Sequence, residues 1–96
     1  MKREDVLRIL SQHRVDIQQF GVDYLGLFGS LARDEAGPQS DVDVLVEFAG
    51  QATFDRYMGL RLYLEDLLGC PVDLVTTRAL RPRLRARVDA ELVRVR

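Results

Sequence analysis

The sequence has few of the residues that form disulfides, metal sites or catalytic pairs in many small proteins. Its 96 residues include one cysteine, one histidine, one lysine and no tryptophan. A lone Cys70 cannot form an internal disulfide, and His13 lies too far along the chain to suggest a cysteine–histidine catalytic pair. No apolar run is long enough to cross a bilayer and no secretory leader opens the chain, so we expect a cytoplasmic protein without membrane contact.

Strong net charge is also absent. The formal net charge is −1, whereas a nucleic-acid-binding domain is usually strongly basic. Positive charge is concentrated in the segment that begins at Arg78, where seven arginines, Arg78 included, accompany Asp89 and Glu91. These acids follow Arg85 and Arg87 by four residues, so the segment is interpreted as a solvated helix face with ion pairs. We therefore expect no direct nucleic-acid partner.

The remaining composition is that of an ordinary globular protein, with 47% hydrophobic and 30% charged residues. We expect a single domain over residues 1–96. A domain of this size buries only roughly 60 to 65% of the surface of its unfolded chain. A large substrate would therefore be met partly by a second protein chain.

Hydrophobic spacing and turn residues predict alternating helices and strands. Thr53 is a predicted helix cap, and Gly69 a predicted helix end. Gly37 and Pro38 should end a short helix. Helices are expected over residues 3–13, 30–36, 54–68 and 78–92, a short helical or turn piece over 14–20, and strands over 22–28, 41–48 and 71–77. This order predicts a mixed α/β fold in which helices pack on a small mixed sheet.

Two aspartates interrupt the second predicted strand, DVDVLVEF. Asp41 and Asp43 are two residues apart, so their side chains share one face of the strand while the valines occupy the other. Like charges this close need a counter-ion, because an unpaired carboxylate near a core is costly. A hard divalent cation such as Mg²⁺ suits paired carboxylates and keeps positions open for substrate phosphates.

A Gly-Ser pair follows the first predicted strand. Gly29 has no side chain, so a phosphate group can approach its backbone closely, and Ser30 opens a short helix whose first N–H groups point outward. Either motif alone is a weak signal. Together, in the order strand, Gly-Ser, helix, turn, Ser-Asp-x-Asp, strand, they are much more specific and favour phosphoryl chemistry.

The run GSLARDEAGPQSDVDVLVEF resembles the signature of the DNA polymerase beta type nucleotidyltransferase superfamily. More narrowly, the short chain resembles the minimal nucleotidyltransferase (MNT) antitoxins that pair with HEPN toxins, and the resemblance covers nearly its whole length. It implies the polymerase-beta-type fold and two Mg²⁺ ions held by Asp41, Asp43 and a third carboxylate. It also implies a nucleoside triphosphate held at Gly29 and Ser30.

Asp73, in the third predicted strand, matches the third carboxylate. By itself it could equally be a solvent-facing residue of an edge strand. The resemblance implies that Asp41 and Asp43 bridge the metals, while Asp73 binds one metal and takes the proton of the acceptor hydroxyl. The acceptor oxygen then attacks the α-phosphate in line, and pyrophosphate leaves.

Arg33 matches the arginine that follows the Gly-Ser turn in this superfamily. It could reach the triphosphate, or it could pin the following turn through an ion pair with Glu35 or Asp41, which is the interpretation that we favour. Asp34 stands where minimal nucleotidyltransferases often have glycine. Ser40 is expected to begin the strand and steady Asp41.

The resemblance further implies transfer of AMP from ATP to a tyrosine of a HEPN RNase toxin, so that the protein acts as its antitoxin. Two alternatives stay open. The protein could be a nucleotide-binding module that neutralises the toxin by complex formation without transfer, which pyrophosphate release would distinguish. It could also be a small-molecule nucleotidyltransferase, although these usually carry an added domain for the acceptor.

The helix over 54–68 offers a candidate partner surface. On a helical wheel Met58 and Leu62 fall outside the apolar arc and would form a small exposed patch. The arc expected to face the core is formed by Phe54, Tyr57, Leu60, Leu64, Leu67 and Leu68. Scattered exposed hydrophobic residues are common, but a domain without its own acceptor pocket needs one on another chain.

Overall fold

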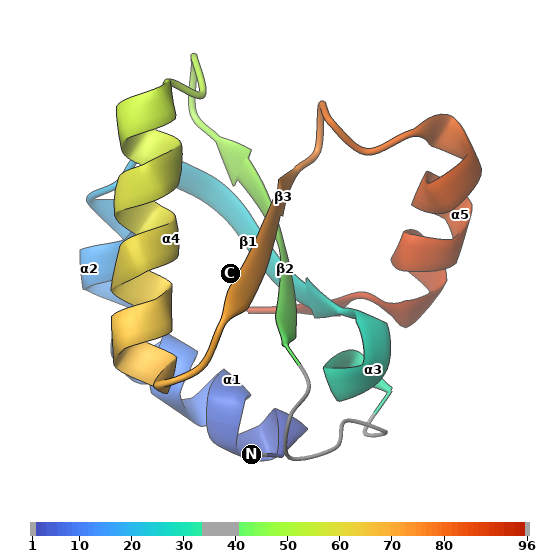
Figure 1. The fold of residues 1–96 in the computed structure, drawn as a ribbon, viewed down its shortest axis with the longest axis horizontal. Helices are drawn as coiled ribbons and strands as arrows, with labels where there is room; N and C mark the ends of the chain where they lie inside the picture. Colours follow the sequence, from blue (N-terminus) through green and yellow to red (C-terminus); the bar gives the residue numbers. More distant parts are fainter. Residues whose placement is uncertain (1, 34–40, 96) are drawn as a thin grey trace.

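A four-stranded mixed sheet forms the centre of the protein, as seen in a computed structural model that describes residues 2–33 and 41–95 (Figure 1). Its strand order is β3-β2-β1-β4, with β1 at Val22–Phe28, β2 at Val42–Phe48, β3 at Val72–Thr76 and β4 at Val93–Arg94. β1 runs antiparallel to β2 and β4, and β3 runs parallel to β2. The predicted mixed α/β fold is confirmed.

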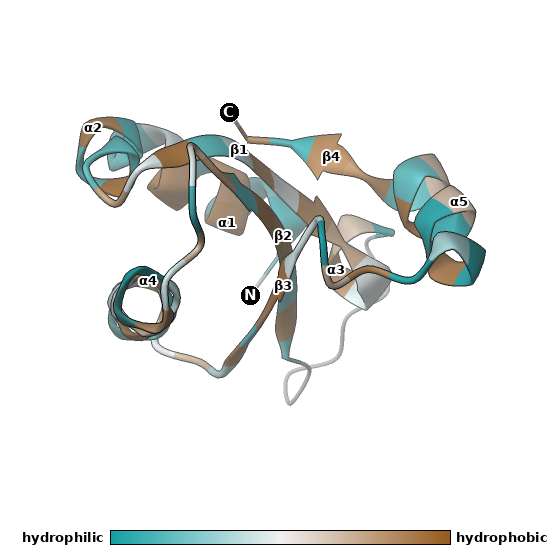
Figure 2. Cartoon of the chain, turned by 90° about the horizontal axis from the view of Figure 1, so that it is seen from above, coloured by the Kyte–Doolittle hydropathy of each residue, from teal (hydrophilic) through white to brown (hydrophobic). Residues whose placement is uncertain are grey.

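Helices lie on both sides of this sheet (Figure 2). The helices α1 (Arg3–Gln12), α2 (Arg14–Gln18) and α4 (Phe54–Leu68) pack on one face, and α5 (Pro82–Glu91) and the short α3 (Gly29–Ala32) lie on the other side. The hydrophobic core lies mainly beneath α1, α2 and α4, where alternate strand residues meet the helices, and it also includes Leu31 and Ala32 of α3. The opposite face of the sheet therefore remains available for the polar residues that alternate with them.

The ends of α4 agree with the sequence prediction. The Thr53 hydroxyl oxygen accepts a hydrogen bond from the Arg56 N–H at 3.2 Å, and Gly69 ends the helix in the left-handed region at φ +70°. These are local devices, because a capping hydroxyl and a glycine act on the residues next to them. The helix connects the parallel strands β2 and β3 as a crossover.

Side chains of α4 also cover the outer edge of β3. The Tyr57 hydroxyl donates a 2.5 Å hydrogen bond to the Leu74 carbonyl, and the Val72 N–H donates a 3.0 Å hydrogen bond to the Glu65 carboxylate. These bonds satisfy backbone groups with which another strand could otherwise pair.

None of the helices in the described ranges has the length and apolar character needed to cross a bilayer.

Several predicted boundaries and exposures need correction. The last helix begins at Pro82 rather than residue 78, because proline is well suited to the first helical position, and Arg81 is its N-cap. The two-residue strand β4 that follows was not predicted. Phe54, expected in the core, has 76% of its surface exposed. Of the two residues expected to form an exposed patch, Leu62 is 58% exposed as expected, but Met58 is half-buried. Gly37, Pro38 and Ser40, with the predictions made for them, lie outside the described residues.

Candidate active site

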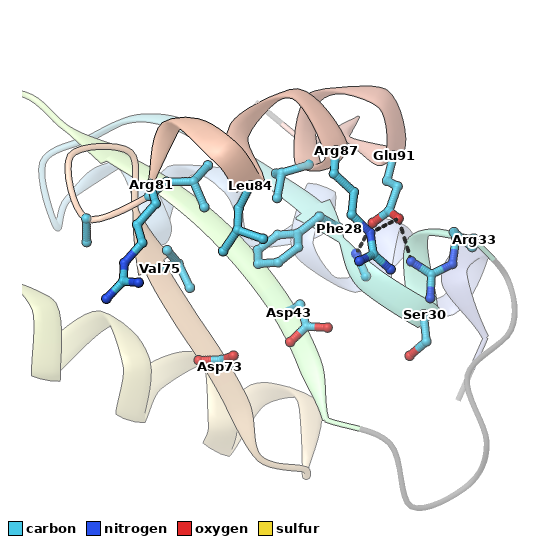
Figure 3. Close-up of a pocket in the computed structure, with 14 residues that line it drawn as sticks. Phe28, Ser30, Arg33, Asp43, Asp73, Val75, Arg81, Leu84, Arg87 and Glu91 are labelled. Carbon is cyan, nitrogen blue, oxygen red and sulfur yellow. Dashed lines mark hydrogen bonds and ion pairs between the residues drawn. The ribbon is translucent and has the colours of Figure 1, made fainter.

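Two carboxylates lie side by side on the open face of the sheet. In the parallel pairing of β2 with β3, Asp43 is directly opposite Asp73. The residues on either side of them are buried in the core: Val42, Val44, Val72 and Leu74. Because strand side chains alternate between faces, Asp43 and Asp73 both point away from the core and into the cleft beneath α5 (Figure 3).

The proximity of these acids changes their protonation. Burial raises the pKa of Asp43, and the charges of Asp73 and Asp41, together with a hydrogen bond that the protonated Asp43 carboxyl donates to Asp73, raise it further, to about 6. The charge of Arg33 opposes this rise. Two carboxylates that compete for one proton are a favourable site for a cation, which can neutralise both.

The predicted triad of acids is only partly assembled. Within residues 2–33 and 41–95, no three acidic, histidine or cysteine side chains are already arranged to hold a metal ion. Asp43 and Asp73 form a pair, and Asp41 immediately precedes β2, exposed to solvent but close enough to affect the pKa of Asp43. The donor set of three carboxylates fits Mg²⁺ chemically, since this ion prefers oxygen ligands and retains several waters.

The Gly-Ser turn is pressed against Asp43. Gly29 has φ +73°, and a Cβ built on it would overlap Oδ2 of Asp43. Any residue other than glycine would be strained there and would displace the carboxylate. The next residue, Ser30, lines the cleft, and its hydroxyl bonds to no other residue in the described part of the chain. The turn therefore brings a serine hydroxyl beside the two acids.

Glu91 also lines this site, which was not predicted from the sequence. Glu91 is the last residue of α5, and its carboxylate accepts a hydrogen bond from the Gly29 N–H at 3.2 Å and another from Arg33 Nη1 at 2.6 Å. Arg87 Nε lies 3.7 Å from the same carboxylate, as its four-residue spacing predicted. No local signal could have joined Glu91 to Gly29, because 62 residues separate them.

The position of Arg33 corrects one prediction and leaves another untested. Arg33 forms an ion pair with Glu91, and among the described residues it forms none with Asp41. The alternative partner Glu35 lies outside the described residues. Arg33 lines the cleft, so the structure leaves it within reach of a bound anion as well.

The cleft between the sheet and α5 has a volume of about 580 Å³. Its wall combines the polar groups above with apolar side chains of β1, β3 and α5, among them Phe28, Val75, Leu84 and Val88. In Figure 3, Ser30 and Arg33 lie on one side of the acids and Arg81 lies on the other. A cleft with an apolar wall and a few convergent polar groups is typical of a site for an organic ligand with a charged end.

Comparison with known proteins identifies the family. The model described as "Nucleotidyltransferase domain" matches residues 6–95. The chain belongs to this nucleotidyltransferase family. It is 40% identical over 93 residues to "Protein adenylyltransferase MntA" of Thermococcus cleftensis, with 96% of this chain and 94% of that protein covered. The predicted enzyme class is confirmed, because family and relative agree over almost the whole chain.

Solved structures of this family share the fold. A chain solved as a minimal nucleotidyltransferase superimposes with a TM-score of 0.83 at 39% identity, covering 97% of this chain and 95% of its own. A chain from a structure of a tri-AMPylated Shewanella oneidensis HEPN toxin in complex with an MNT antitoxin gives a TM-score of 0.69 at 19% identity. That alignment covers 94% of this chain and 71% of the other, and at this identity it speaks for the fold alone. The predicted resemblance to minimal nucleotidyltransferases is confirmed.

Proposed function

We propose that this nucleotidyltransferase transfers AMP from ATP to a tyrosine hydroxyl of a HEPN-type toxin and thereby acts as its antitoxin. The observation that carries the proposal is the pair of acids on the cleft floor, Asp43 and Asp73, against which the Gly29 turn is packed. The protein acceptor is supported by the name of the Thermococcus relative and by the AMPylated toxin in the Shewanella complex.

Asp41, Asp43 and Asp73 are the residues that would hold Mg²⁺, and two ions are expected from the resemblance. When bound, the metal neutralises phosphate charge and lowers the pKa of the acceptor hydroxyl. Asp43 and Asp73 orient the reacting groups at the cleft floor, and Asp73 accepts the proton of the acceptor hydroxyl. The acceptor oxygen forms a bond to the α-phosphorus, the bond from this phosphorus to the bridging oxygen breaks, and pyrophosphate leaves.

Gly29, Ser30 and Arg33 are proposed to hold the triphosphate. The hydroxyl of Ser30 is available for a phosphate oxygen, and the glycine backbone permits close approach. Arg33 brings a guanidinium group, which suits phosphate because it offers two parallel N–H donors. These groups lie beside the acids, so a triphosphate bound there would place its α-phosphate near Asp43 and Asp73 (Figure 3).

A labelling experiment tests the proposal. The protein is incubated with Mg²⁺, ATP labelled on the α-phosphate and a HEPN-type toxin, and both label transfer and pyrophosphate release are measured. We expect label on the toxin with wild-type protein and none with Asp43→Asn. Replacing the acceptor tyrosine of the toxin by phenylalanine should also abolish labelling. Nucleotide binding without pyrophosphate release would instead support the binding-module alternative.

A further inference from the structure

Three hydrogen-bond donors of the cleft converge on one carboxylate of the protein itself. Glu91 Oε2 accepts from the Gly29 N–H at 3.2 Å, Glu91 Oε1 accepts from Arg33 Nη1 at 2.6 Å, and Arg87 Nε lies 3.7 Å from Oε1. The Glu91 side chain is only 16% exposed, although it belongs to a surface helix. Burial raises the pKa of Glu91, but hydrogen bonds from Arg33 and Gly29 lower it by more, so the group is an anion at neutral pH.

These donors are of the kind that bind phosphate. A backbone N–H and guanidinium groups make charge-assisted hydrogen bonds to phosphate as readily as to carboxylate. Gly29, Arg33 and Arg87 line the same cleft as Asp43 and Asp73 (Figure 3). The carboxylate therefore lies among donors that line the same cleft as Ser30, where the triphosphate is proposed to bind.

We propose that Glu91 is an intramolecular competitor of the nucleotide triphosphate, and that it determines how tightly this enzyme binds its substrate. The proposal rests on the function proposed above and adds a residue that opposes binding. A phosphate group can take the Gly29 N–H and the Arg33 Nη1 only after the Glu91 carboxylate has released them, and it competes with the same carboxylate for the charge of Arg87. The observed affinity is then reduced by the fraction of molecules in which the donors are available.

Removing the charge of Glu91 should therefore tighten binding while weakening the fold. Glu91→Gln keeps the shape of the side chain but makes a poorer partner for the two guanidinium groups, so it competes less strongly with phosphate for them. The dissociation constant for pyrophosphate and for Mg²⁺ with a non-hydrolysable ATP analogue should fall roughly three- to tenfold. The melting temperature should fall as well, because the contact between α5 and the Gly-Ser turn is weakened. A purely structural role would lower both affinity and stability.

The matched control is Asp89→Asn. Asp89 is on the same helix, is exposed, and loses the same charge on substitution, but it does not line the cleft. Titration calorimetry on the full chain should show that this variant changes the dissociation constant for pyrophosphate by less than twofold. If Asp89→Asn tightened pyrophosphate binding as much as Glu91→Gln does, the effect would be explained by the change in net charge alone, and the proposal would be overturned.

Unchanged or weaker pyrophosphate binding by Glu91→Gln would also overturn it. Should Glu91→Gln not fold, Glu91→Asp retains the charge but retracts the carboxylate by one methylene group. Tighter binding by that variant supports the proposal, and unchanged or weaker binding refutes it. A wild-type protein that binds pyrophosphate but not the Mg²⁺–ATP analogue would refute the proposed function, while the comparison of variants with pyrophosphate would still decide the role of Glu91.

Discussion

Gly29→Ala probes the tightest packing in the candidate site. An alanine at φ +73° is strained by about 1 to 2 kcal/mol, because its Cβ crowds the neighbouring carbonyl in the left-handed region. The same Cβ would overlap Oδ2 of Asp43, so either the carboxylate or the turn has to move. We expect Mg²⁺-dependent transfer to be lost, because both the turn proposed to bind phosphate and an acid proposed to bind the metal are displaced.

Gly50→Ala separates backbone strain from this overlap. Gly50 has the same φ of +73°, but a Cβ built there meets no atom within 4 Å. Gly50→Ala should therefore lower the melting temperature by roughly 4 to 16 °C, the shift that 1 to 2 kcal/mol gives in a domain of this size, and leave transfer intact. Thermal unfolding and the labelling assay, run on both variants, measure the two effects. A Gly29→Ala protein as stable and as active as Gly50→Ala would refute the packing argument.

The other predictions concern the acids and the partner surface. Asp43 has a pKa of about 6 when folded and about 3.8 when unfolded, so it binds more protons in the folded state between these values; the stability of the metal-free protein should fall as pH rises from about 4 to 6. In Asp43→Asn this loss of stability between about pH 4 and pH 6 should be smaller. Chemical denaturation at several pH values across this range measures it. Asp73→Asn should abolish label transfer while calorimetry still detects nucleotide; undiminished transfer would remove Asp73 from the mechanism. Met58→Glu combined with Leu62→Lys should keep nucleotide binding and lose co-purification with the toxin, whereas loss of both would indicate a damaged core.

Local signals explain why much of the fold could be predicted. The β1 strand, Val22–Phe28, was predicted to the residue because an apolar run lies between Gly21 and Gly29, and both glycines adopt positive φ. The α4 helix was equally well defined, since Thr53 and Gly69 act on their immediate neighbours. The residues that begin and end these elements lie next to them in the sequence, so their boundaries do not depend on tertiary packing.

The errors fall where packing decides. A helical wheel gives the apolar arc of α4 but not how far the sheet extends beneath it, so Phe54 was assigned to the core although it is 76% exposed. The two-residue strand β4 is too short to show a periodic pattern. Its pairing with β1 is a tertiary contact, as is the 2.8 Å hydrogen bond from the Val95 N–H to the Leu25 carbonyl.

The candidate site divides in the same way. Asp41, Asp43, Gly29 and Ser30 could be named as candidates from the sequence because the motif is contiguous and two carboxylates in an apolar strand need an explanation. Glu91 met the pattern of an ordinary helix ion pair with Arg87, and that pair does form. Its second role arises only because α5 crosses the open face of the sheet and brings the carboxylate to the Gly29 N–H. The spacing to Arg87 already accounts for Glu91, so nothing in the sequence indicates its second contact, with Gly29. That contact could be found only in the folded structure.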